Sequence, residues 1–236
     1  MRYLFLTAAL FVAGCSFWSF PGITGSGKLV TKEISLGDFN QVDASGAIHL
    51  DVTQGTTSSV VVTADDNLWD FVEVRNDGGT LYLGTKDGFY NNTHISAKIV
   101  MAHLSALTLS GATNGSIRDF NDAAGRMDLT LSGASTLDGG LRKGQVTLNV
   151  AGASTATLHG TADLVNVTVS GASHVGLEDF ASDVIHADVS GASNANVTAH
   201  RKLDYDVSGA SHLSYAGNPT IRHAEVSGAS SVTSAQ

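Results

Sequence analysis

Acidic and imidazole side chains recur at two fixed positions near the C-terminus of the chain. A short sequence close to Ser-Gly-Ala-Ser returns many times, and the third residue before its glycine is Asp188, Asp206 or Glu225 in three successive copies. The fifth residue before the glycine in the same copies is His186, Asp204 or His223. Imidazole nitrogen and carboxylate oxygen are suitable ligands for a divalent metal ion. If successive copies lie side by side, these residues predict a metal site.

Two interpretations of these columns remain open. Neighbouring strands lie about 4.8 Å apart, so stacked carboxylates repel each other, and protons, cations or histidines must offset the repulsion. In one interpretation Asp188, Asp206, Glu225, His186 and His223 have a function, which is to bind a metal ion or a sugar or to act in catalysis. In the other they form a solvated polar face on which both histidines pair with Asp204.

The repeat itself determines how these residues are positioned. Its glycines are separated by 18 to 22 residues, at Gly111, Gly133, Gly152, Gly171, Gly191, Gly209 and Gly228. A period of about 19 residues predicts a solenoid in which each coil buries its apolar face against the next. We therefore expect an all-β fold, a single-chain parallel β-helix with a less regular N-terminal part. An earlier copy at Gly46 leaves room for roughly three more coils before Gly111.

Side-chain alternation predicts which residues face inward. Counting by twos around Gly171 gives Val167, Val169, Gly171, Ser173 and Val175, and strand residues of one parity share a face. We expect the glycine and the second serine to point inward at a sharp bend, and the alanine to point outward. The outward alanines would form a stripe in the stacked coils: Ala112, Ala134, Ala153, Ala172, Ala192, Ala210 and Ala229. This stripe is either an assembly surface, for example of a homotrimer, or only what a tight bend tolerates.

The N-terminal sequence predicts a lipid anchor. One basic residue, Arg2, precedes an apolar run that ends in Val-Ala-Gly and the only cysteine, Cys15. This run is typical of a signal peptide, and the end resembles the site at which bacterial lipoproteins are cleaved and lipidated. We expect a signal peptide over 1–14, a lipid-anchored tether over 15–33 and a β-helical domain over 34–236. The alternative is an ordinary cleaved signal peptide with a coincidental cysteine.

The region between Gly46 and Gly111 shows alternating strands with turns at Thr-Gln-Gly-Thr and Asn-Asp-Gly-Gly. The segment Asp-Asp-Asn-Leu-Trp-Asp-Phe fits a single helical turn. We expect its aromatic residues, Trp69 and Phe71, to pack over the open end of the solenoid.

Charge excludes one class of partner. The 236-residue chain has 13 Lys and Arg against 22 Asp and Glu, a formal net charge of -9. Such a surface repels nucleic acid and is not attracted to anionic lipid headgroups. The expected contact with the membrane is therefore the lipid on Cys15. Because Ser16 follows the cysteine, we expect this lipid to anchor the protein in the outer membrane of the bacterial envelope.

Three segments resemble the autotransporter adhesin, head GIN domain family of bacterial surface proteins. They are ADDNLWDFVEVRNDGGTLYL, the repeated SGAS, and LSYAGNPTIRHAEVSGASSV, in which Tyr215, Gly217, Asn218 and Pro219 are the most specific residues. The resemblance covers about 34–232. It implies a β-helix similar in outline to pectate lyases, no catalytic set, and a role in cell adhesion with a homotrimer as one form. We also expect no cofactor.

Two function classes follow. A non-enzymatic adhesion or scaffold module needs repeated shape and a tether, and would bind a surface glycan or protein. The alternative is a carbohydrate- or cation-binding β-helix related in shape to polysaccharide lyases, and carbohydrate binding would need a row of aromatic side chains for stacking on sugars. The chain has only two Trp and five Tyr and lacks such a row, so the sequence favours adhesion.

Overall fold

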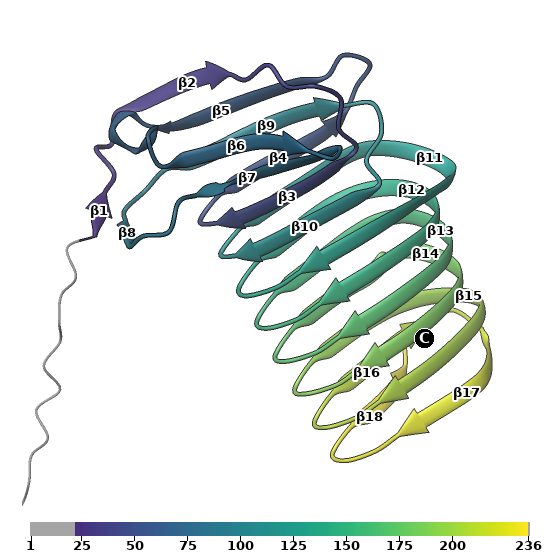
Figure 1. Ribbon diagram of the computed structural model, residues 1–236. Coiled ribbons are helices and arrows are strands. Elements are labelled where there is room, and N and C mark those ends of the chain that lie inside the picture. Colours follow the sequence, from purple (N-terminus) through teal and green to yellow (C-terminus); the bar gives the residue numbers. More distant parts are fainter. Residues whose placement is uncertain (1–21, 236) are drawn as a thin grey trace, which may run out of the picture.

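Alternating apolar and polar residues build a stack of curved strands in the C-terminal part of the chain. The computed structural model describes residues 22–235. These residues form a parallel β-solenoid of about six turns, covered at one end by N-terminal strands (Figure 1). The predicted fold class, an all-β parallel β-helix, is confirmed.

The strands fall into two groups along the chain. The solenoid strands are β10 (Ala106–Gly111), β11 (Asn114–Leu131), β12 (Thr136–Val150), β13 (Thr155–Val169), β14 (His174–Val189), β15 (Asn194–Val207), β16 (His212–Ala216), β17 (Thr220–Val226) and β18 (Ser231–Ser234). The N-terminal elements are β1 (Ile23–Thr24), β2 (Leu29–Glu33), β3 (Gln41–Gly46), β4 (His49–Gln54), β5 (Ser59–Asp65), the 3₁₀ turn η1 (Asp66–Leu68), β6 (Val72–Asp77), β7 (Thr80–Thr85), β8 (Tyr90–Asn91) and β9 (Ile95–Met101).

Each regular coil is one long strand that bends about halfway. The first halves of β11–β15 pair in parallel with one another and with β4 and β16, and we call this sheet the first wall. The second halves pair with one another and with β10 and β17, and form the second wall. The Ser-Gly-Ala-Ser sequence turns the chain from the second wall back to the first, and we call this turn the near bend. The opposite turn is the far bend.

Columns of branched aliphatic side chains fill the space between the walls. In the second wall Leu131, Val150, Val169, Val189 and Val207 are paired in register, and each is at most 1% exposed. Burying one such side chain stabilises the fold by about 1.5–3 kcal/mol. The residues that alternate with this column must therefore point to solvent.

The near bend corrects one expectation. Its second serine is buried as predicted, but its glycine is exposed and does not point inward. From Gly111 to Gly228 these glycines have φ between 73° and 82°, a left-handed conformation that side chains rarely adopt. A Cβ on Gly171 would lie 2.4 Å from the carbonyl oxygen of Gly152 in the preceding coil. Glycine is required by the backbone conformation and by close stacking of coils, rather than by a crowded interior.

Hydrogen bonds between coils run along the near bend. The amide of each bend alanine donates to the carbonyl of the near-bend glycine in the preceding coil, as Ala172 does to Gly152 at 2.7 Å. Buried serine hydroxyls donate to backbone carbonyls, either within their own turn, as Ser173 does to Ser170 at 2.8 Å, or to the preceding coil, as Ser193 does to Gly171 at 3.3 Å. Buried polar groups at this bend are therefore paired, which allows a serine column to lie inside the solenoid.

The far bend takes up most of the differences in coil length. Between Ile117 and Phe120, β11 has one residue more than β12, and it has two more between Asp122 and Arg126. β14 has one residue more than β13 before Phe180. β15 has three residues fewer than β14 before the pair of Ala181 and one more before the pair of Val184. The last coil is the exception, because its extra residue lies inside β17.

The N-terminal part is not three further coils. Gly46 pairs directly with Gly111, so the coil made by β3 and β4 stacks on β10 and β11. The residues between them return to form β7 and β9 on the outer side of β3 and β4. Outside β9 lie β5 and then β2, and outside β7 lies β6. Each of these three strands is antiparallel to its neighbour, and together they end the parallel stack. A regular period alone could not reveal this insertion.

Polar and aromatic contacts hold this N-terminal cap together. The solvent-inaccessible Asp65 carboxylate accepts hydrogen bonds from the amides of His94 and Gly27, each at 2.7 Å. The His94 amide is the main reason why the pKa of Asp65 lies below its usual value. Trp69, directly after η1, packs against the core as expected, whereas Phe71 contacts the Tyr90 ring.

The folded part begins before the predicted boundary at 34. β2, which falls in the segment expected to be a tether, pairs with β5 over its whole length. The expected signal peptide and Cys15 lie outside the described residues.

The C-terminal end of the stack carries no comparable cap among the described residues. All residues of β17 are exposed, including Ile221 at 38% and Val226 at 49%. β17 and β18 are therefore held by one neighbouring coil only.

The stacking at the near bend predicts the effect of a larger side chain. Gly191→Val should lower the free energy of unfolding by on the order of 2–5 kcal/mol, because Val combines left-handed strain with a clash against the Gly171 carbonyl. Ala172→Ser at the exposed neighbouring position should change it by less than about 0.5 kcal/mol. Urea unfolding measures both, and a Gly191→Val protein as stable as its parent would contradict the described bend.

Candidate functional site

The acidic column lies on the outside of the second wall, as the sequence predicts. Asp188 pairs with Asp206, and Asp206 pairs with Glu225, so the three residues stand in adjacent coils. All three are exposed, because the residues that follow Asp188 and Asp206 belong to the buried aliphatic column.

The neighbouring column divides around Asp204. Its carboxylate pairs with the Lys202 ammonium at 2.5 Å and with Nδ1 of His186 at 3.3 Å. The hydrogen bond from Lys202 is the main cause that lowers the pKa of Asp204. Lys202 was absent from the predicted site, although its position two residues before Asp204 on the same strand face could have identified it.

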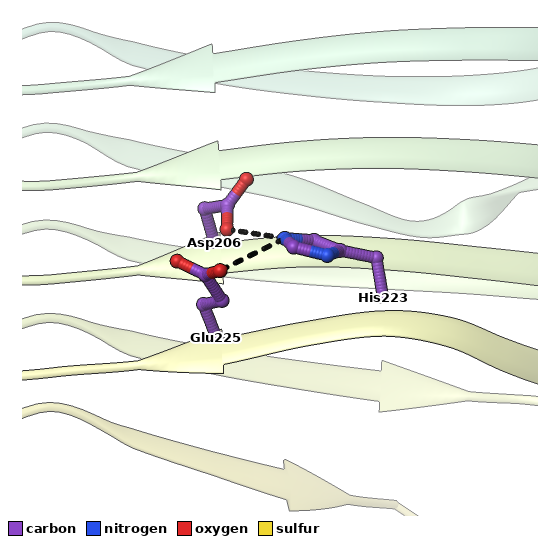
Figure 2. A group of neighbouring side chains, drawn as sticks. All are labelled: Asp206, His223 and Glu225. Carbon is purple, nitrogen blue, oxygen red and sulfur yellow. Dashed lines mark hydrogen bonds and ion pairs between the residues drawn. The ribbon is translucent and has the colours of Figure 1, made fainter.

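His223 does not pair with Asp204 through its side chain, contrary to one sequence-based interpretation. Only its backbone amide reaches the Asp204 carboxylate, at 3.3 Å. Its Nε2 lies 2.7 Å from Oδ1 of Asp206 and 3.9 Å from Oε1 of Glu225 (Figure 2). The hydrogen bond with Asp206 is the main cause that raises the pKa of His223.

The predicted five-residue metal site therefore separates into two groups. Asp206, His223 and Glu225 each offer a ligand atom, and these atoms all lie within 4.8 Å of one another. His186 belongs instead with Asp204 and Lys202, and Asp188 stands beside both groups without an ion pair among the described residues. A depression of about 310 Å³ runs along this face, bordered by both groups.

The alanine stripe exists as predicted. Every bend alanine is exposed, and each lies one coil from the next through the amide ladder. The residues concerned are Ala112, Ala134, Ala153, Ala172, Ala192, Ala210 and Ala229. The backbone of a partner could approach this surface closely, because only methyl groups project from it.

The fold and these exposed columns define a class: a parallel β-solenoid that presents the same type of side chain at regular intervals. Residues 38–219 match the family described as "putative auto-transporter adhesin, head GIN domain", and the chain belongs to this family. The resemblance seen in the sequence is thus confirmed.

Solved structures share the fold. A "putative adhesin" from Bacteroides fragilis has a TM-score of 0.84 at 22% identity, with 91% of this chain and 100% of that chain covered. A "putative lipid binding protein" from Parabacteroides distasonis has a TM-score of 0.71 at 19% identity, covering 91% and 99%. A "putative adhesin" from Parabacteroides merdae has 0.69 at 20%, also covering 91% and 99%. No curated protein matches the chain.

Within residues 22–235, no helix has the length and apolar character needed to cross a bilayer.

A double substitution tests whether the alanine stripe mediates assembly. Ala153→Arg with Ala192→Arg should dissociate an oligomer that packs through the stripe while leaving the solenoid folded, because both side chains are exposed. Light scattering of the purified protein gives the mass, and circular dichroism checks the fold. A monomeric parent, or an oligomer that tolerates both arginines, would exclude the stripe as an assembly surface.

Proposed function

We propose that the protein is a non-enzymatic adhesin of the bacterial cell envelope, which binds a surface glycan or protein through the far bend of the solenoid. Family membership supports the adhesive role. The observation that carries the proposal is the contrast between the two bends: the near bend repeats one short sequence, whereas the far bend varies in length and composition from coil to coil. Variable segments on a rigid scaffold commonly carry recognition.

One part of the far bend is well suited to bind a partner. The bulge at Arg118 and Asp119 in β11 borders a depression of about 500 Å³, with the small residues Gly140 and Gly160 on its other side. Asp119 has φ 67°, and backbone strain of this kind clusters at binding sites.

The polar groups of this depression are available for a ligand. Within the described part of the chain, the side chains of Arg142, Asp138 and His159 form no hydrogen bond or ion pair, and all three residues are exposed. Arg binds carboxylate or phosphate groups with two parallel hydrogen bonds, and Asp accepts hydrogen bonds from sugar hydroxyls or amides. This composition suits an acidic glycan or a polar protein surface.

The solvent exposure of the histidine and carboxylate columns favours binding over catalysis. Acid-base and electrostatic catalysis depend on groups held in surroundings from which water is excluded. The His223 and Asp206 side chains are 48% and 54% exposed. A solvated position of this kind weakens their interaction with a developing charge.

In the proposed arrangement, lipid on Cys15 holds the protein at the outer membrane. β1 joins β8 within the cap, so a tether that begins at Cys15 enters the fold at the capped end. The uncapped coils would then project away from the membrane. A homotrimer packed through the alanine stripe would place three far bends outward.

Binding through the far bend predicts a charge-specific loss. Screening the full-length chain carrying Cys15→Ser against glycan and matrix-protein arrays should yield at least one specific ligand. Arg142→Glu should weaken that binding at least tenfold. Lys98→Glu, which reverses the same charge at an exposed position of β9, should leave it unchanged. The absence of any ligand would contradict adhesion, and equal binding by both variants would exclude this part of the far bend.

The lipid anchor has its own test. Cells grown with a fatty-acid analogue should label the wild-type protein, and Cys15→Ser should abolish the label because the chain has no other cysteine. Ser16→Ala serves as the matched control and should be labelled normally. Equal label in wild type and Cys15→Ser would show that the protein is not a lipoprotein.

A further inference from the structure

A bulge in the last coil sets the direction of the His223 side chain. Leu203 pairs with Ile221, but Tyr205 pairs with Ala224, so β17 has one residue more than β15 at this point. β-Bulges bend a strand and redirect its side chains, and they are frequent beside functional sites. Here the bulge removes the His223 ring from the column of Asp204 and turns it toward Asp206 and Glu225 (Figure 2).

Only His223 itself offsets the negative charge around this ring. Asp188, Asp206 and Glu225 stand in adjacent coils, roughly 4.8 Å apart, where like charges repel. Among the residues described, no Lys or Arg forms an ion pair with any of them, and His223 is shared between two. Asp204 in the next column differs, because Lys202 and His186 both pair with it. The group around His223 thus lacks the cation that its neighbour has.

The positions of the three ligand atoms suit a small divalent ion. Two atoms that each lie about 2.1 Å from one ion are roughly 3–4 Å apart. Nε2 of His223 is 2.7 Å from the Asp206 oxygen and 3.9 Å from the Glu225 oxygen, so small rotations of exposed side chains are sufficient. A nitrogen ligand beside two carboxylates favours an ion of the zinc type over calcium or magnesium.

We propose that Asp206, His223 and Glu225 bind a zinc-type divalent cation that joins the last coil to the body of the solenoid. Asp206 comes from β15 and the other two ligands from β17, so one ion would connect the two strands. Three protein ligands leave a position for water or for a group of a bound partner, and the depression along this face provides access. This site is independent of the adhesive far bend.

Binding would affect the coil that the structure supports least. β17 is exposed along its whole length and is paired on one side by β15. An ion that binds the folded state only shifts the equilibrium toward that state. Zinc should therefore slow hydrogen exchange in β17 while leaving the capped N-terminal strands unchanged.

Calorimetric titration of the full-length chain with Zn²⁺ tests the site. Cys15→Ser in every sample removes the only thiol as a competing ligand. We expect one ion per chain, and Asp206→Asn, His223→Ala and Glu225→Gln should each weaken binding at least tenfold. His186→Ala is the matched control on the same wall and should bind as the parent does. Asp206→Asn and Glu225→Gln preserve side-chain shape, so they decide the outcome if His223→Ala does not fold.

Three results would overturn the proposal. They are no saturable binding of Zn²⁺ at millimolar concentration, equal loss in His186→Ala and His223→Ala, or tighter binding of Ca²⁺ than of Zn²⁺. Zinc-dependent slowing of hydrogen exchange in β17, lost in Asp206→Asn, would support the proposed connection between the coils.

Discussion

The structure depends on one contact at the near bend, where the alanine amide of each coil donates to the glycine carbonyl of the coil before. Between Ala172 and Gly152 this distance is 2.7 Å, and a Cβ on Gly171 would come within 2.4 Å of the same oxygen. Because no side chain fits between the bends, successive coils must superpose at this point. The register of both walls follows from it, and so do the buried aliphatic columns and the exposed acidic column.

This constraint separates the framework from the recognition surface. The near bend tolerates little change, so differences in coil length appear where coils need not superpose closely. Most of them lie at the far bend, where Arg118 and Asp119 bulge outward next to Gly140. The other lies within β17, where one additional residue redirects His223. Both proposed binding sites therefore lie where the regular repeat is interrupted.

Alternation along the strands allowed much of the fold to be predicted from the sequence. It identified the buried Val167 and Val169, the inward Ser173 and the stacked carboxylates of Asp188 and Asp206. It was wrong for the glycine, because a left-handed residue interrupts the alternation and sequence parity carries no information on φ. It also missed the order of the N-terminal strands, since Gly46 contacts Gly111 across 65 residues that fold back around it. The partner of His223 could not be predicted, because the glycine spacing shows that the last coil is one residue longer than the coil before it but does not place that residue inside β17.

Native-state hydrogen exchange at the bend alanines tests the central claim most directly. The side chains of Ala134, Ala153, Ala172 and Ala192 are exposed, so an ordinary surface turn at these positions would exchange rapidly. If the amide ladder holds the coils together, these four amides should exchange as slowly as those of the buried valines Val150 and Val169. Exchange at the rate of an unprotected loop would show that the ladder does not hold the solenoid.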